Sequence, residues 1–177
     1  RLDRKTRHAA DMYINVLEQL GVTDVSNHGL HIETCKEWND EVSRFYESQG
    51  VMPHDKLIGF NIGSAVPEKR WPAERFADVA DYFADKGYKT VFFGGPMDLE
   101  MVKPVVEHMK TTPIVATGAF KIGSLAAAMK WCDLLITNDS GPMHVAISQG
   151  VPIVALYGPS NPFFYGPYQA KSIVLES

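Results

Sequence analysis

From Leu57 onward, short apolar runs alternate with segments of helical periodicity, and this alternation limits the possible folds more than any other feature. The runs predict strands at Leu57–Asn61, Thr90–Phe93, Ile114–Ala116, Leu134–Ile136, Ile153–Leu156 and Ser172–Leu175. Helices are predicted from Pro72 to Gly87, Met97 to Met109, Gly123 to Trp131 and Gly141 to Gly150, with a kink or break at Pro104. Strict alternation of strands and helices predicts an α/β fold, a Rossmann-like doubly wound parallel sheet.

The first 50 residues lack this alternation. Amphipathic patterns predict one helix over residues 1–20 and another over 37–49, with a short strand near Leu30–Ile32. The basic start of the first helix (Arg1, Arg4, Lys5, Arg7) is interpreted as a solvated helix end, with a surface for another domain or an anionic membrane as the alternative. We therefore divide the chain into a helical linker or edge segment, 1–50, and a Rossmann-like domain, 51–177.

Composition excludes several classes of protein. The chain has 177 residues, 45% of them hydrophobic, and a net charge of -4, which gives no reason to expect nucleic-acid binding. No apolar run approaches the roughly 20 residues that span a bilayer. Cys35 and Cys132 have no metal or redox spacing, and His28 and His31 lack a matching set of ligands, so we predict a cytoplasmic protein without a metal site.

Special residues follow each predicted strand, and in a parallel sheet these loops share the carboxyl edge, where ligands bind. Glycines there allow close approach of the backbone, a lysine offers a cation, and a helix start favours phosphate. The candidate donor-binding residues are Gly63, Ser64, Lys69, Gly95, Glu100, Asp139, Ser140, Gly141 and His144. Together they predict a site for a nucleotide diphosphate, although neither G-x-G-x-x-G nor a Walker A motif is present.

Each candidate also has a structural interpretation. Spacing alone favours helix capping for Ser140 and leaves Asp139 evenly balanced between capping and function. His144 is more typical of a packed side chain, and Lys69 of exposed surface charge. A hydrolase using Asp139, Ser140 and His144 is disfavoured because the nucleophile elbow G-x-S-x-G is absent.

Several of these motifs, in order, resemble glycosyltransferase family 9, the ADP-heptose:lipopolysaccharide heptosyltransferases. The resemblance extends from about Leu57 to Tyr168. The matching segments are Gly63–Ala65 with Lys69–Pro72, Gly94–Pro96 with Asp98 and Glu100, Asn138–Ala146, Gly150–Pro152 and Leu156–Pro162.

The resemblance implies the C-terminal, donor-binding half of a GT-B fold, with ADP-heptose as donor and the lipopolysaccharide inner core as acceptor. The family's N-terminal acceptor domain, including its proposed Asp general base, has no counterpart in these residues, and the chain is expected to stop short of the family's C-terminal helix. It is therefore expected to bind donor without transferring sugar. Inverting transfer would proceed by direct displacement, without a metal or cofactor, in a protein that contacts the inner face of the bacterial inner membrane.

The resemblance also implies residue roles. Lys69 would stabilise charge on the departing ADP, Asp139 would lie at the junction of diphosphate and sugar, and these two are the predicted catalytic residues. Ser140 and Gly141 would bind phosphate, and His144 would orient that turn or reach the phosphate. Glu100 would bind the ribose, and adenine would lie against Gly118–Ile122. Two alternatives remain: a transferase half that uses another nucleotide sugar, and a non-catalytic nucleotide-binding domain.

Overall fold

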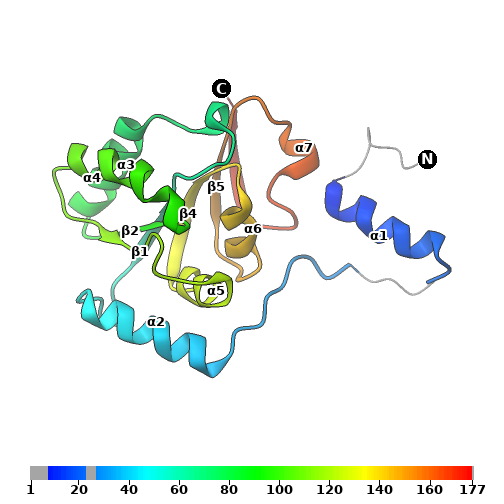
Figure 1. Ribbon diagram of the computed structural model, residues 1–177, viewed down its shortest axis with the longest axis horizontal. Helices are drawn as coiled ribbons and strands as arrows, with labels where there is room; N and C mark the ends of the chain where they lie inside the picture. Colours follow the sequence, from blue (N-terminus) through cyan, green and yellow to red (C-terminus); the bar gives the residue numbers. More distant parts are fainter. Residues whose placement is uncertain (1–7, 23–26, 177) are drawn as a thin grey trace.

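A six-stranded parallel sheet forms the centre of the protein (Figure 1). The computed structural model describes residues 8–22 and 27–176. Its strands are β1 (Leu57–Asn61), β2 (Lys89–Phe93), β3 (Ile114–Val115), β4 (Cys132–Asn138), β5 (Ile153–Tyr157) and β6 (Ser172–Glu176). Its α-helices are α1 (Ala9–Gln19), α2 (Lys36–Ser48), α3 (Ala73–Asp85), α4 (Leu99–His108), α5 (Ile122–Met129), α6 (Gly141–Ile147) and α7 (Pro162–Tyr165), with 3-10 turns at Pro67–Lys69 and Pro96–Asp98.

The strand order is β3-β2-β1-β4-β5-β6, and every neighbouring pair is parallel. This is the order of a Rossmann-like doubly wound sheet, so the predicted fold class is confirmed. The chain leaves β1 toward one edge of the sheet and later returns to β4 on the other side of β1. The crevice between the carboxyl ends of β1 and β4 is therefore the topological switch point, where such sheets bind ligands.

Alternate strand residues supply two buried clusters, one on each face of the sheet. Phe60 and Phe92 pack with α3 and α4 on one face, while Phe93 and Leu135 pack with α5 and α6 on the other. Figure 1 shows these helix pairs on opposite sides of the strands. In the central strands β1, β2 and β4, the period of two thus produces the two-sided burial that a parallel sheet requires, whereas the edge strand β6 is largely exposed.

Helix α2 lies against the domain as an outer layer beyond α5 (Figure 1). Tyr46 is fully buried, its hydroxyl donates to the carbonyl oxygen of Ala128 at 3.0 Å, and burial raises its pKa well above the ordinary value. A Cβ at Gly123 would lie 2.6 Å from the Trp38 ring, so only glycine allows this approach of α2 and α5. The boundary predicted at residue 50 stays a prediction, but part of the core comes from before it.

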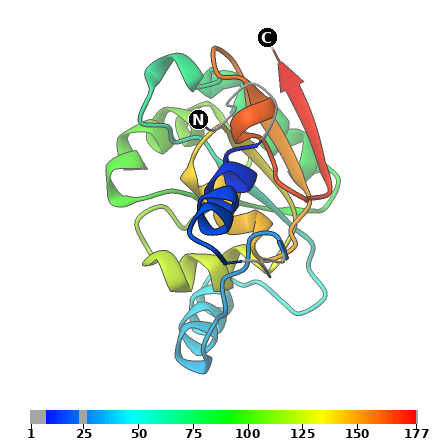
Figure 2. The same ribbon diagram turned by 90° about the vertical axis from the view of Figure 1, so that its right-hand side faces the viewer.

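Helix α1 lies outside the sheet layers and contacts the loop after α7 (Figures 1 and 2). The His8 and Tyr168 rings stack at 4.5 Å, and the Tyr168 hydroxyl donates to Asp11. The predicted basic helix start, residues 1–7, lies outside the described residues.

Three local predictions need correction. No strand forms at Leu30–Ile32; the Ile32 carbonyl instead accepts a hydrogen bond from the Gln149 side chain at 2.8 Å. Helix α4 continues through Pro104, so the break does not occur, while the kink predicted as its alternative stays a prediction. The helix predicted at Gly123–Trp131 begins at Ile122 and ends at Met129, because Cys132 already belongs to β4.

Candidate functional site

The loops that leave β1 and β4 meet at the switch point. Asn61, the last residue of β1, pairs in register with Thr137, and β4 ends one residue later at Asn138. The first loop then carries Gly63, Ser64 and Lys69, whereas the second consists only of Asp139 and Ser140 before α6 begins. The predicted donor-binding residues of these two loops therefore lie together.

Lys69 and Asp139 form an ion pair across this crevice. The Lys69 Nζ lies 2.6 Å from the Asp139 Oδ2, and the two side chains are 24% and 7% exposed. The Ser160 hydroxyl, from the loop after β5, donates to the same Oδ2 at 2.6 Å. Three loops thus converge on one buried carboxylate, whose charge is compensated by a cation and a hydroxyl.

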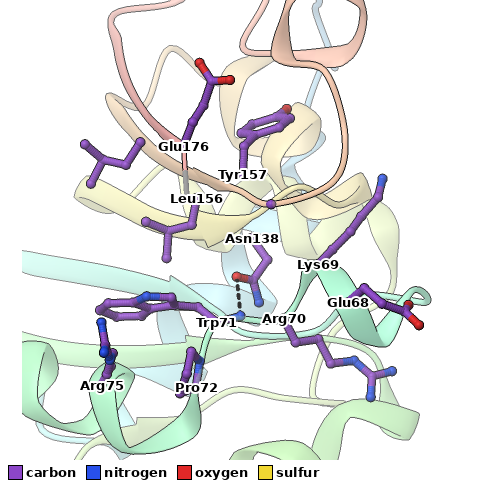
Figure 3. A pocket seen from close by; sticks show the side chains of 12 residues that line it. Glu68, Lys69, Arg70, Trp71, Pro72, Arg75, Asn138, Leu156, Tyr157 and Glu176 are labelled. Carbon is purple, nitrogen blue, oxygen red and sulfur yellow. Dashed lines mark hydrogen bonds between the residues drawn. The ribbon is translucent and has the colours of Figure 1, made fainter.

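The first loop is attached to the sheet at both ends. The Asn138 Oδ1 accepts the Trp71 backbone N–H at 3.1 Å, a bond visible in Figure 3, and its Nδ2 donates to the Ile62 carbonyl at 2.8 Å. The Arg70 guanidinium donates twice to the Ser64 carbonyl, at 2.8 and 2.7 Å, and closes the loop on itself. These contacts fix the short turn that presents Lys69, so Arg70 has a structural role in the loop.

Asn61, at the end of β1, connects the start of the loop after β1 to the loop after β4. It is fully buried, and its Nδ2 donates to the Ser140 Oγ at 2.7 Å and to the Thr137 Oγ1 at 3.1 Å. Asn61 is not among the residues predicted for the site, although a polar side chain that ends an apolar strand was an available signal. Ser140 occupies the N-cap position of α6 without a capping hydrogen bond from its side chain. The capping interpretation is therefore wrong, because this hydroxyl bonds to Asn61 and, at 3.3 Å, to the Asn138 carbonyl.

The loop after β2 packs directly against the loop after β1. A Cβ on Gly63 would lie 2.5 Å from the Asp98 Oδ1, which requires glycine there, and the Asp98 Oδ2 accepts the Gly95 N–H at 2.8 Å. Glu100 lies on the exposed first turn of α4, whereas Asp98, from the same loop region, lines the hollow beside Gly63 and Ser140. Gly118 donates to the Gly94 carbonyl at 2.9 Å, so the segment predicted to hold adenine borders this same loop.

His144 lies half-buried one turn into α6. Burial lowers its pKa below 6.5, the nearby Asp139 carboxylate opposes that shift, and His8 adds to it. Burial and the neighbouring His8 thus favour the neutral form of this imidazole. Since the Ser140 hydroxyl bonds to Asn61 and Asn138, the structure gives no support to a serine hydrolase.

Two adjoining hollows share Ser64, Ala65, Ser140 and Gly141. One, of about 490 Å³, is bordered by Met97, Asp98 and Met101; the other, of about 360 Å³, contains Lys69, Asp139, His144 and Tyr165. A Cβ at Gly141 would meet no atom within 4 Å, so the start of α6 faces open space. A cation beside open backbone at a switch point suits a diphosphate.

A third hollow, of about 420 Å³, lies beyond Trp71 (Figure 3). Trp71, Leu156 and Leu175 form its apolar walls. It shares Lys69 with the smaller of the other two hollows but is not lined by Asp139, Ser140 or Gly141.

The described ranges contain neither a cluster of metal ligands nor a membrane-spanning helix. Residues 8–22 and 27–176 contain no group of three or more His, Cys, Asp or Glu side chains placed to hold a metal ion. Within the same ranges, none of the helices has both the length and the apolar character needed to cross a bilayer.

Comparison with known proteins gave consistent matches. The model of "Glycosyltransferase family 9 (heptosyltransferase)" matches residues 2–177. Lipopolysaccharide heptosyltransferase 2 of Escherichia coli K12 is 36% identical over 124 residues, which cover 67% of this chain and 36% of that protein. The chain thus spans about a third of the length of this curated relative.

Solved structures agree in fold. A family 9 glycosyl transferase from Veillonella parvula DSM 2008 has 80% identity and a TM-score of 0.95, over 100% of this chain and 51% of that one. The E. coli ADP-heptose lipopolysaccharide heptosyltransferase II has 31% identity and a TM-score of 0.73, over 82% and 44% respectively.

Proposed function

The chain belongs to glycosyltransferase family 9, the heptosyltransferase family, and from this premise we propose that it binds the nucleotide-sugar donor of a heptose transfer to the lipopolysaccharide inner core. The donor is ADP-heptose, and the chain corresponds to the donor-binding half of a GT-B enzyme. The acceptor is a lipid-linked oligosaccharide held by residues outside these 177.

One observation supports this proposal above the others. The Lys69 Nζ meets the Asp139 Oδ2 at 2.6 Å in the switch-point crevice, beside the open backbone of Gly141. A diphosphate at this place gains a cation and backbone donors, while the carboxylate faces the glycosyl end of the donor. The pair therefore separates a phosphate-binding side of the site from a sugar-binding side.

In the proposed reaction, an acceptor hydroxyl attacks the anomeric carbon from the face opposite the diphosphate. The new carbon–oxygen bond forms as the bond to the β-phosphate oxygen breaks, and ADP leaves with the bonding electrons. Lys69 stabilises the charge that develops on ADP. Asp139 orients the sugar, and the acceptor proton passes to a base outside this chain. The configuration at the anomeric carbon is inverted because the hydroxyl attacks from the face opposite the leaving diphosphate.

Titration calorimetry of the 177-residue chain with ADP, UDP, GDP and ADP-heptose tests the proposal. We expect binding of ADP and ADP-heptose and much weaker binding of UDP and GDP. Preference for UDP or GDP would indicate a transferase half for another nucleotide sugar. Absence of binding by all four would contradict donor binding by this chain.

We propose a cytoplasmic location with peripheral contact at the inner membrane, since the acceptor is a lipid. Sedimentation of the chain with and without vesicles of anionic lipid tests the membrane contact.

A further inference from the structure

The two hollows on either side of Ser140 and Gly141 differ in chemistry. The larger one has methionine walls from Met97 and Met101 and suits a nucleoside. The smaller one combines a carboxylate and an imidazole with one aromatic residue, Tyr165. Hydrogen-bonding groups beside an aromatic side chain suit a sugar, because a pyranose has polar hydroxyl edges and an apolar C–H face.

Tyr165 belongs to α7, a single turn that is fixed at several points. The Asn161 side chain accepts the Phe163 N–H at 2.9 Å, and the Gly166 N–H donates to the Pro162 carbonyl at 2.7 Å. The buried Tyr157 hydroxyl donates to the Tyr165 carbonyl at 2.9 Å, which ties the turn to the sheet. The backbone that carries Tyr165 is therefore held without help from the Tyr165 side chain.

The Tyr165 ring lies 6.4 Å, centroid to centroid, from the Phe164 ring and takes no part in the hydrogen bonds that hold the turn. It is 53% exposed, although aromatic residues are costly to leave in water, and it lies at the hollow that contains Lys69 and Asp139. Ligand sites are lined largely by apolar and aromatic side chains with a few polar groups among them, and Tyr165 gives this polar hollow such a side chain.

We infer that Tyr165 is a specificity-determining residue that packs its ring against the glycosyl group of the bound nucleotide sugar. This inference rests on the proposed function and adds a residue for the sugar end of the donor. Tyr165 shares the smaller hollow with Lys69, Gly141 and Asp139. In this proposal the diphosphate takes the Lys69 and Gly141 side, the sugar takes the Asp139 side beside Tyr165, and the nucleoside lies in the larger hollow.

The chain offers a matched control on the same turn. Phe163 is also 53% exposed, but it does not line the hollow. Phe163→Ala thus removes an equally exposed aromatic ring from α7 without changing the proposed sugar contact.

The experiment measures the dissociation constants of ADP and ADP-heptose by calorimetry for the original chain, Tyr165→Ala, Tyr165→Phe and Phe163→Ala. We expect Tyr165→Ala to weaken ADP-heptose binding about three- to tenfold, the range for one aromatic contact. Its ADP affinity should not change, Tyr165→Phe should retain most of the ADP-heptose affinity, and Phe163→Ala should retain both. Thermal unfolding of each variant checks that α7 is intact.

The inference is overturned if Tyr165→Ala weakens ADP and ADP-heptose equally, leaves both unchanged, or matches Phe163→Ala. In each of these cases ADP still binds the original chain, so the proposed function survives. An original chain that binds neither ligand overturns the proposed function and this inference with it.

Discussion

The ammonium group of Lys69 and the carboxylate of Asp139 are 2.6 Å apart, although 70 residues separate them in the sequence. They come from different loops, after β1 and β4, and the strand order places those loops side by side. A phosphate group must compete with Asp139 for Lys69, so the ion pair governs how the site accepts its ligand.

Lys69→Ala should weaken ADP binding about 10- to 100-fold, because it removes a charge-assisted hydrogen bond to the diphosphate. Calorimetry with ADP measures the change. Lys86→Ala, at the exposed end of α3, removes a lysine whose ammonium lies over the Tyr82 ring and should leave the affinity unchanged. Equal affinities for Lys69→Ala and the original chain would remove Lys69 from the site.

Asp139→Asn should strengthen ADP binding severalfold, because the free chain then no longer neutralises Lys69 and the buried carboxylate no longer repels phosphate. The change in affinity is measured by the displacement of a fluorescent ADP analogue from each variant by unlabelled ADP. Asp85→Asn removes a carboxylate from the last turn of α3 and controls for net charge. A large loss of ADP affinity in Asp139→Asn alone would mean that the carboxylate itself holds the nucleotide.

Asn61→Leu should lower the free energy of unfolding by about 1–3 kcal/mol, because the Ser140 and Thr137 hydroxyls lose a buried donor. Thr90→Val should have the opposite effect on stability. Among the described residues, the buried Thr90 Oγ1 has no hydrogen-bond partner, so its removal should be neutral or stabilising. Urea unfolding of both variants tests the pair, and equal destabilisation by both would contradict the role given to Asn61.

Asp81 should make stability depend on acid pH. Burial acts to raise the pKa of this carboxyl, but hydrogen bonds from the Lys110 and Thr111 backbone and the Thr111 hydroxyl outweigh it and hold the pKa below 3.8. The lowered folded-state pKa stabilises the protein above 3.8, and this contribution disappears as the pH falls through the folded value. Asp81→Asn should therefore be less stable at pH 7, and the gap should narrow below pH 3.8; a constant gap in thermal unfolding would contradict this.

The sequence predicted the sheet better than it predicted the contacts at its edge. Alternating apolar runs were sufficient to predict the six strands and the burial of the central ones on both faces, although β6 at the edge is largely exposed. The contact of Asn61 with Ser140 was not predictable from these patterns, because it depends on β1 lying next to β4. Several strand orders are compatible with the same alternation of strands and helices.

The remaining differences also have physical causes. Val42 and Tyr46 mark a buried face of α2, but periodicity does not say which element covers it, and the structure shows that α5 does. Helix α7 is a single turn within a segment rich in Gly and Pro, too short for a periodic pattern. The donor-binding roles predicted for all the site residues, Lys69 and Asp139 included, stay predictions. Asp98 joins them as the acidic residue of the loop after β2 that lines the crevice.

A crystal structure of the chain with ADP tests the central claim most directly. We predict that the diphosphate lies at the switch point, with a phosphate oxygen about 3 Å from both the Lys69 Nζ and the Gly141 N. The central claim would be contradicted if ADP were bound in the third hollow, beyond Trp71, with Lys69 still paired to Asp139.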